Sequence, residues 1–179
     1  MKYKCIIISI ILILLSSCSF VNNNNSNKSS TIEHPDLKLT NAKYKVNLSK
    51  ETQIKFISDN IEFYNKKNLS YINNVSFSVT NNKNEIIAEG SSDKIEVNTK
   101  TNNLFLSKNV IIKIKNPQLN IKCDKINWNN KNRTLNTDNE VFIESEYGIF
   151  EGVGFSANLD TRYFEFKELK KGELFEKNN

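Results

Sequence analysis

The chain has 179 residues, of which 25 are Lys or Arg, 20 are Asp or Glu and one is His, giving a formal net charge of +5. This length allows one domain or at most two. Only five Gly, two Pro and three Cys are present, a composition that excludes collagen-like, proline-rich and disulfide-scaffold proteins.

The N-terminus has the three parts of a secretory signal. Two lysines lie in the first four residues, and residues 5–15 are apolar except for one serine. This stretch is shorter than the roughly 20 residues that cross a bilayer. It ends in Leu-Ser-Ser-Cys at residues 15–18, a pattern that resembles the bacterial lipoprotein box. We therefore expect a lipoprotein signal peptide over residues 1–17 and lipidation of Cys18; the alternative is an ordinary signal peptide with a Cys at its cleavage site.

Lipid on Cys18 would attach the mature chain to a membrane without a spanning segment. Two or three acyl chains make such attachment effectively permanent, because each buried methylene contributes about 0.8 kcal/mol. Cleavage removes two lysines, so the mature chain keeps 23 basic and 20 acidic side chains and a net charge of +3. No basic run is long enough to follow a phosphate backbone, and nucleic acid is not an expected partner.

Residues 18–36 are predicted to form a flexible tether. Asparagine and serine dominate this segment, which cannot bury enough apolar surface to order itself. After processing and lipidation, Cys123 is the only free thiol, so no intramolecular disulfide can form. The folded domain must therefore be stabilised by burial and hydrogen bonds alone.

From Leu37 onward, apolar and polar residues alternate with a period of two, which is typical of half-buried strands. No apolar stripe of helical period has a useful length. The turn signals are asparagines rather than glycines, and asparagine tolerates the left-handed conformation that hairpins need. We therefore predict an all-β domain over residues 37–168, followed by a charged C-terminal tail over residues 169–179.

A repeat of about 30 residues organises these strands. Residues 59–63 (Asp-Asn-Ile-Glu-Phe) recur as Asp-Lys-Ile-Glu-Val at 93–97 and Asp-Lys-Ile-Asn-Trp at 124–128, and a weaker copy begins at Gly154. Each copy is followed by a polar turn and a second apolar strand. Because a single hairpin cannot cover its own apolar face, we predict stacked antiparallel hairpins with a shared apolar interior and two unpaired edges. The anchors of the four copies are spaced by 34, 31 and 29 residues and are Ile61, Ile95, Ile126 and Phe155.

The order and spacing of these motifs resemble the LptC/LptA group of lipopolysaccharide-transport proteins, the OstA-like β-jelly-roll family. The resemblance covers roughly residues 40–168, and the N-terminal anchor makes it closer to LptC than to LptA. Each motif is short and degenerate, so their order carries the specificity. The motifs are Asn109-Val110, the segment 124–128, Leu135-Asn136-Thr137-Asp138 leading into Val141 and Ile143, Gly152-Val153-Gly154-Phe155, and Leu159-Asp160-Thr161 to Phe166.

This resemblance implies a periplasmic, lipid-anchored component of a machine that exports lipopolysaccharide or a related glycolipid. Acyl chains would lie inside the jelly roll, and an inner-membrane ABC transporter would supply the energy. The jelly roll of the transporter's permease and an LptA-like bridge protein would pair with the two sheet edges. The inner membrane is the expected location, although the best-known LptC proteins use a transmembrane helix where this chain has a lipoprotein box.

We expect large apolar side chains to face the interior, although plain core packing accounts equally well for each one. The edge that pairs with a partner is expected near the C-terminus. The interior candidates for lipid contact are Phe77, Val97, Leu106, Ile112 and Trp128, and the edge candidates are Gly154, Phe155, Phe164 and Phe166.

The sequence does not predict an enzyme, a cofactor or a metal site. His34 is the only histidine and lies in the predicted tether, which excludes a His-based triad or a multi-histidine metal site. Cys123 has no histidine near it in the pattern and occupies a repeat position that serine holds in two other copies, so we interpret it as a structural thiol. The aspartates that begin three of the copies are read as strand-end or turn residues rather than as metal ligands.

Two other functions remain open at this stage. The chain is alternatively a surface lipoprotein whose β-stack is a display or adhesion scaffold. It is also compatible with a periplasmic carrier of a lipid other than lipopolysaccharide.

Overall fold

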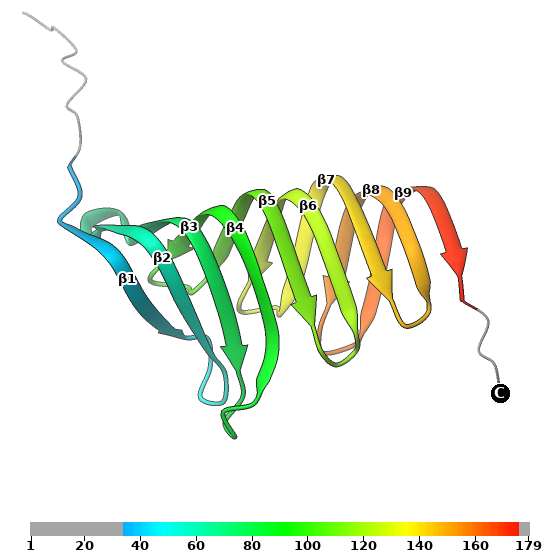
Figure 1. The fold of residues 1–179 in the computed structure, drawn as a ribbon, viewed down its shortest axis with the longest axis horizontal. Helices are drawn as coiled ribbons and strands as arrows, with labels where there is room; N and C mark the ends of the chain where they lie inside the picture. Colours follow the sequence, from blue (N-terminus) through cyan, green and yellow to red (C-terminus); the bar gives the residue numbers. More distant parts are fainter. Residues whose placement is uncertain (1–33, 176–179) are drawn as a thin grey trace, which may run out of the picture. The chain divides into compact units, whose positions relative to one another are not determined.

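The computed structural model describes residues 34–175, which form a single antiparallel sheet of nine strands in chain order (Figure 1). The predicted all-β fold of stacked hairpins is thereby confirmed. The predicted signal peptide, Cys18 and the tether up to residue 33 lie outside the described residues. The strands are β1 (Leu37–Asn47), β2 (Gln53–Tyr64), β3 (Leu69–Thr80), β4 (Ile86–Asn98), β5 (Leu104–Ile114), β6 (Leu119–Asn129), β7 (Thr134–Ser145), β8 (Gly148–Asn158) and β9 (Tyr163–Leu174), with a short 3-10 helix η1 (Asn65–Lys67) between β2 and β3.

The four sequence repeats correspond to the hairpins β2–β3, β4–β5, β6–β7 and β8–β9, and β1 precedes them as a further strand. The anchors of the first three repeats, Ile61, Ile95 and Ile126, are completely buried. They lie in one cross-strand row, in which Ile72 and Leu106 occupy the intervening positions. One repeat is therefore the length of chain after which the next apolar anchor again lies in this buried row.

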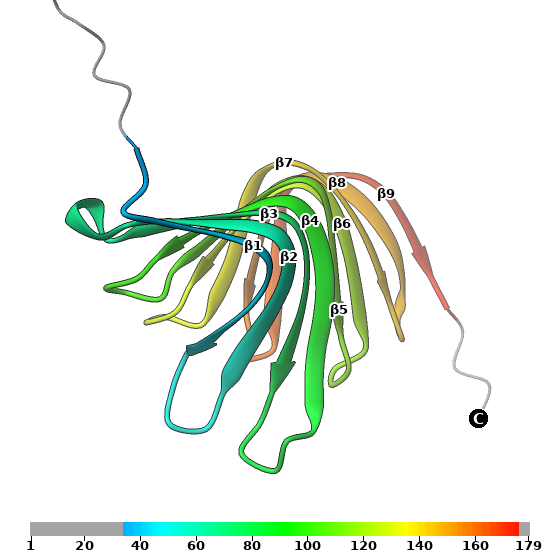
Figure 2. The ribbon, with the colours of Figure 1, turned by 60° about the vertical axis from the view of Figure 1, so that its left-hand side comes forward.

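Several strands bend near their middle (Figure 2). At these bends the strand pairing loses its regular register, as in a β-bulge, where an extra residue bends the strand. Asparagine and glycine occupy the bend on β1, β3, β5 and β8 because they adopt left-handed backbone angles at low cost. These residues are Asn41, Asn74, Asn109 and Gly154, with φ angles of 49°, 48°, 52° and 67°.

The recurring aspartates lie at the same bends, and not at strand ends or in turns as their position in the repeat suggests. Asp59 on β2 accepts a hydrogen bond of 2.8 Å from the side-chain amide of Asn74 on β3. Asp93 on β4 accepts one of 2.9 Å from Asn109 on β5. The repeat thus carries two signals, one for the buried row and one for the bend.

Strand β9 extends to Leu174, six residues beyond the predicted end of the domain at 168. The residues assigned to a charged tail therefore belong to the sheet as far as 174, where Leu174 pairs with Gly148 of β8. An edge strand has one neighbour only and keeps most of its side chains in solvent, so its sequence lacks the apolar alternation on which the prediction depended.

Gly90 on β4 provides space for an aromatic ring in the interior. A Cβ atom at this position would lie 2.5 Å from Cζ of Phe77 on β3 and 2.2 Å from the carbonyl oxygen of Ile111 on β5. The ring of Phe77 therefore takes the volume that a side chain at 90 would fill.

Candidate functional site

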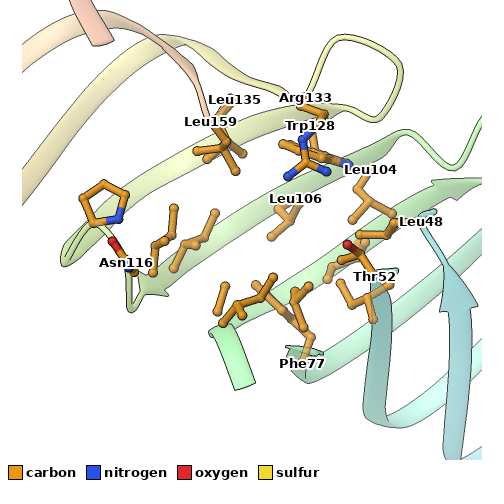
Figure 3. A pocket seen from close by; sticks show the side chains of 18 residues that line it. Leu48, Thr52, Phe77, Leu104, Leu106, Asn116, Trp128, Arg133, Leu135 and Leu159 are labelled. Carbon is orange, nitrogen blue, oxygen red and sulfur yellow. The ribbon is translucent and has the colours of Figure 1, made fainter. Parts of the chain in front are cut away.

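An apolar groove with a volume of about 190 Å³ lies along the interior of the sheet (Figure 3). It is lined from both sides of the bend, which places apolar side chains on opposing walls. The lining residues on one side of the bend include Ile54, Phe77 and Ile112. Those on the other side include Leu104, Trp128 and Leu135.

Four of the five predicted interior residues line this groove. Phe77, Leu106 and Ile112 are each less than 9% exposed, and Trp128 is partly buried. Val97 is completely buried between Ser70 of β3 and Leu104 of β5 and does not line the groove. Val97 is thus a residue of the packed core.

The turns contribute lining residues that the sequence did not indicate. Leu48 and Thr52 come from the β1–β2 connection, Arg133 from the β6–β7 turn and Leu159 from the β8–β9 turn. The alternation of apolar and polar residues predicts burial only within strands, so it does not indicate which turn residues are buried. Only the packing of the two sides of the bend brings these residues to the groove.

The interior is packed rather than open near the C-terminal edge. Here Phe155 is almost completely buried, and its ring centroid lies 6.3 Å from that of Phe164 and 5.5 Å from that of Phe166. Phe150 completes the cluster at 6.2 Å from Phe164. The groove therefore does not continue unchanged through this end of the sheet.

The predicted edge residues divide between two strands. Phe164 and Phe166 lie on the edge strand β9, but Gly154 and Phe155 lie on β8, which pairs with β7 on one side and β9 on the other. The assignment of Gly154 and Phe155 to an edge is therefore wrong, because β9 covers them. Gly154 has a different role: the aliphatic stem of Lys167 passes over it, 2.6 Å from where a Cβ would lie.

Two hydrogen bonds join the end of β1 and the β1–β2 turn to turns at the opposite ends of the strands. The turns that follow odd and even strands lie at opposite strand ends, because all strands are antiparallel and in chain order. Nevertheless, Nδ2 of Asn130 donates to the carbonyl oxygen of Leu48 at 2.9 Å, and Nδ2 of Asn102 donates to that of Asn47 at 3.0 Å. We call these four residues the turn clasp. Since Leu48 also lines the groove, the clasp holds the β1–β2 turn at the groove's mouth.

A charged side chain and an indole are among the few polar groups of this lining. Nε of Arg133 donates a hydrogen bond of 2.5 Å to Asp160. Nε1 of Trp128 is buried and has no hydrogen-bond partner among residues 34–175. An indole nitrogen is a donor only, and a buried donor without an acceptor costs about 1–3 kcal/mol.

Cys123 has the character of a structural thiol. Burial, with a smaller contribution from the negative charge of Asp124, raises the pKa of its thiol to about 12. The thiol therefore stays protonated at neutral pH and is a weak nucleophile. Residues 34–175 contain no cluster of three or more His, Cys, Asp and Glu side chains arranged to hold a metal ion. The same part of the chain has no helix with the length and hydrophobicity needed to span a membrane.

Comparisons with known proteins identify the family. The model of the LptC-related lipopolysaccharide-assembly family matches residues 5–174. No curated protein matches the chain in sequence. Among solved structures, the chain is similar to LptH of Pseudomonas aeruginosa, described as the LptA-homologous periplasmic component of the lipopolysaccharide transport device, with a TM-score of 0.56 and 9% identity over 69% of this chain and 94% of LptH. Because the family match covers nearly the whole chain, the protein belongs to the LptC-related family, whose members are periplasmic components of lipopolysaccharide transport.

Proposed function

We propose that the protein shelters acyl chains of lipopolysaccharide, or of a related glycolipid, in its groove and passes them from an inner-membrane ABC transporter toward the outer membrane. The observation that carries this proposal is the apolar groove lined from both sides of the bend. Acyl chains are the ligands that such a lining suits, since each methylene transferred from water contributes about 0.8 kcal/mol.

The two edges of the sheet support a place between other jelly rolls. β1 and β9 each pair with one neighbour only, so each offers unpaired backbone groups to a strand of another protein. We assign one edge to the jelly roll of the transporter's permease and the other to an LptA-like bridge protein. Edge pairing of this kind would align the interiors of successive proteins.

Attachment through lipid on Cys18 fits the same role. The described strands begin at Leu37, so residues 19–36 separate the lipidated residue from the sheet. This short connection would keep the groove close to the membrane from which the glycolipid is taken.

A photo-crosslinking residue in place of Trp128 tests this function in cells. We expect a glycolipid adduct at position 128, because this side chain lines the groove. Lys122 lies on the same strand but is exposed, so the same residue at position 122 is the matched control and should give no lipid adduct. Crosslinks at 128 to proteins alone, without lipid, would contradict an acyl-chain site.

A further inference from the structure

The lining of the groove contains a single charge. Among the 18 described residues that line it, Arg133 is the only charged one, and the others are apolar apart from Thr52, Asn116 and the indole of Trp128. An arginine remains protonated at any physiological pH. A permanent cation in an apolar lining indicates that the groove takes a ligand with an anionic part.

The β6–β7 turn, residues 130–133, holds Arg133 in place. The amide of Leu159 donates a hydrogen bond of 3.0 Å to the carbonyl oxygen of Arg133, and Asn130 of the same turn belongs to the turn clasp. The backbone at 133 is therefore fixed on both sides by neighbouring turns. Its position does not depend on the ion pair with Asp160.

The guanidinium group has donors left for a ligand. A guanidinium carries five N–H donors, and the bond to Asp160 uses the one on Nε. The side chains of Arg133 and Asp160 are 41% and 58% exposed, so water screens this ion pair and an incoming anion can compete with it. Asp160 is thus a partner that a ligand can share or replace.

The indole of Trp128 is another polar group in the lining. It lines the same groove as Arg133, and the two side chains overlap in the view of Figure 3. Its buried Nε1 has no acceptor within residues 34–175. Because this Nε1 is buried, the exposed guanidinium of Arg133 is the polar group that an incoming anion can reach.

We infer that Arg133 binds the phosphate or carboxylate group of the ligand at the mouth of the groove, while the acyl chain of the same ligand occupies the groove. Guanidinium groups bind both anions through paired, charge-assisted hydrogen bonds. This inference rests on the proposed function, because it requires an acyl chain in the groove. It adds that the position of the head group is fixed, so that the ligand enters in one orientation.

The test compares amphiphiles that share one chain and differ in the head group. The chain from residue 19 onward is used, without the apolar signal and the lipidated cysteine, so that no detergent is needed to keep the protein in solution. The affinities for dodecyl phosphate, dodecanoate and dodecanol are measured by displacement of a fluorescent fatty-acid probe. We expect the anionic ligands to bind more tightly than dodecanol, and Arg133→Gln to reduce this preference about tenfold, the size expected for a lost charge-assisted contact.

Two variants separate charge from structure. Lys131→Gln removes a cation from the same turn that does not line the groove, and it should leave the preference unchanged. Asp160→Asn removes the partner of Arg133 but keeps the cation, and the preference should stay or increase. Thermal unfolding of each variant verifies that it is folded.

The possible outcomes distinguish this inference from the proposed function. If all three ligands bind and Arg133→Gln leaves the preference unchanged, the anion site is wrong while acyl-chain binding stands. If Asp160→Asn lowers the preference as much as Arg133→Gln does, Arg133 serves only to hold the turn, and the inference is overturned. If no ligand binds to the parent chain, the proposed function fails as well. A stronger effect of Arg133→Gln on dodecyl phosphate than on dodecanoate identifies phosphate as the preferred head group.

Discussion

Asn74 donates a side-chain hydrogen bond of 2.8 Å to Oδ2 of Asp59 at the point where β2 and β3 bend together. The donor has a left-handed backbone with a φ angle of 48°. The same arrangement returns one repeat later, between Asn109 and Asp93. In the first two repeats, the bend that creates the two walls of the groove is therefore accompanied by the same polar pair.

Substitutions at Asn74 should separate the backbone contribution from that of the side chain. Asn74→Gly keeps the left-handed backbone and loses one exposed hydrogen bond, so we expect a loss of about 0.5–1 kcal/mol in the free energy of unfolding. Asn74→Ala adds the strain of a left-handed residue with a Cβ, about 1–2 kcal/mol more. Urea unfolding of both variants measures the difference, and equal stabilities would show that the bend does not need a left-handed residue.

Gly90 should tolerate no side chain. A Cβ would lie 2.5 Å from the ring of Phe77 and 2.2 Å from a backbone oxygen, so Gly90→Ala should destabilise the fold by about 1–3 kcal/mol through overpacking. Gly172 is the control, because a Cβ there meets its nearest neighbours at 3.5 Å, and Gly172→Ala should change stability by less than about 0.5 kcal/mol. Thermal unfolding compares the two, and similar losses would contradict the role given to Gly90.

The sequence predicted the parts of this fold that depend on local periodicity. The repeat predicts the anchors Ile61, Ile95 and Ile126, because each hairpin has a nearly constant length and the buried position therefore recurs at a nearly constant spacing. Arg133 and Leu48 were missed because they reach the groove from turns at opposite strand ends, and only the bend brings them together. The extent of β9 was missed for a related reason, since an exposed edge strand needs no apolar alternation.

The turn clasp should control the opening of the groove at the β1–β2 turn. Asn130→Ala removes the hydrogen bond to Leu48 and should cost ~1 kcal/mol in local stability. We expect faster hydrogen exchange at the amides of Leu48 and Ser49, which donate to Thr52 within this turn. Mass spectrometry of peptides from residues 47–53 measures this exchange.

Asn132→Ala is the matched control for the clasp. Asn132 lies in the same turn as Asn130, is exposed, and has no side-chain hydrogen bond to the described residues. This variant should leave exchange at the β1–β2 turn unchanged. Equal acceleration in both variants would mean that any change in the β6–β7 turn loosens the neighbouring turn, and that the clasp bond has no specific role.

The raised pKa of the Cys123 thiol predicts that the free energy of unfolding decreases at alkaline pH. Its pKa rises from 9.0 to about 12 in the folded chain, mainly because burial disfavours the thiolate. The unfolded chain therefore releases this proton at lower pH than the folded chain does, so the contribution to stability is complete below pH 9 and is lost as the pH rises toward 12.

Urea unfolding at pH 8 and pH 10.5, with Cys123→Ala beside the parent chain, measures this contribution. Other groups also titrate in this range, so the informative quantity is the difference between the two chains. The parent should lose more stability than Cys123→Ala between the two pH values. Parallel losses would show that the thiol ionises equally well in the folded and unfolded chains.

Lipidation of Cys18 predicts where the domain is found when cells are fractionated. Replacing residues 1–18 by a signal peptide that is cleaved without lipidation removes both the apolar signal and the residue that the Leu-Ser-Ser-Cys pattern assigns to lipidation, and we expect the domain to move from the membrane fraction to the soluble periplasmic fraction. Retention at the membrane after this change would contradict the assignment, because residues 34–175 contain no membrane-spanning helix. Protease added to intact cells should leave the parent protein uncut, whereas digestion would support the alternative of a surface lipoprotein over a periplasmic carrier.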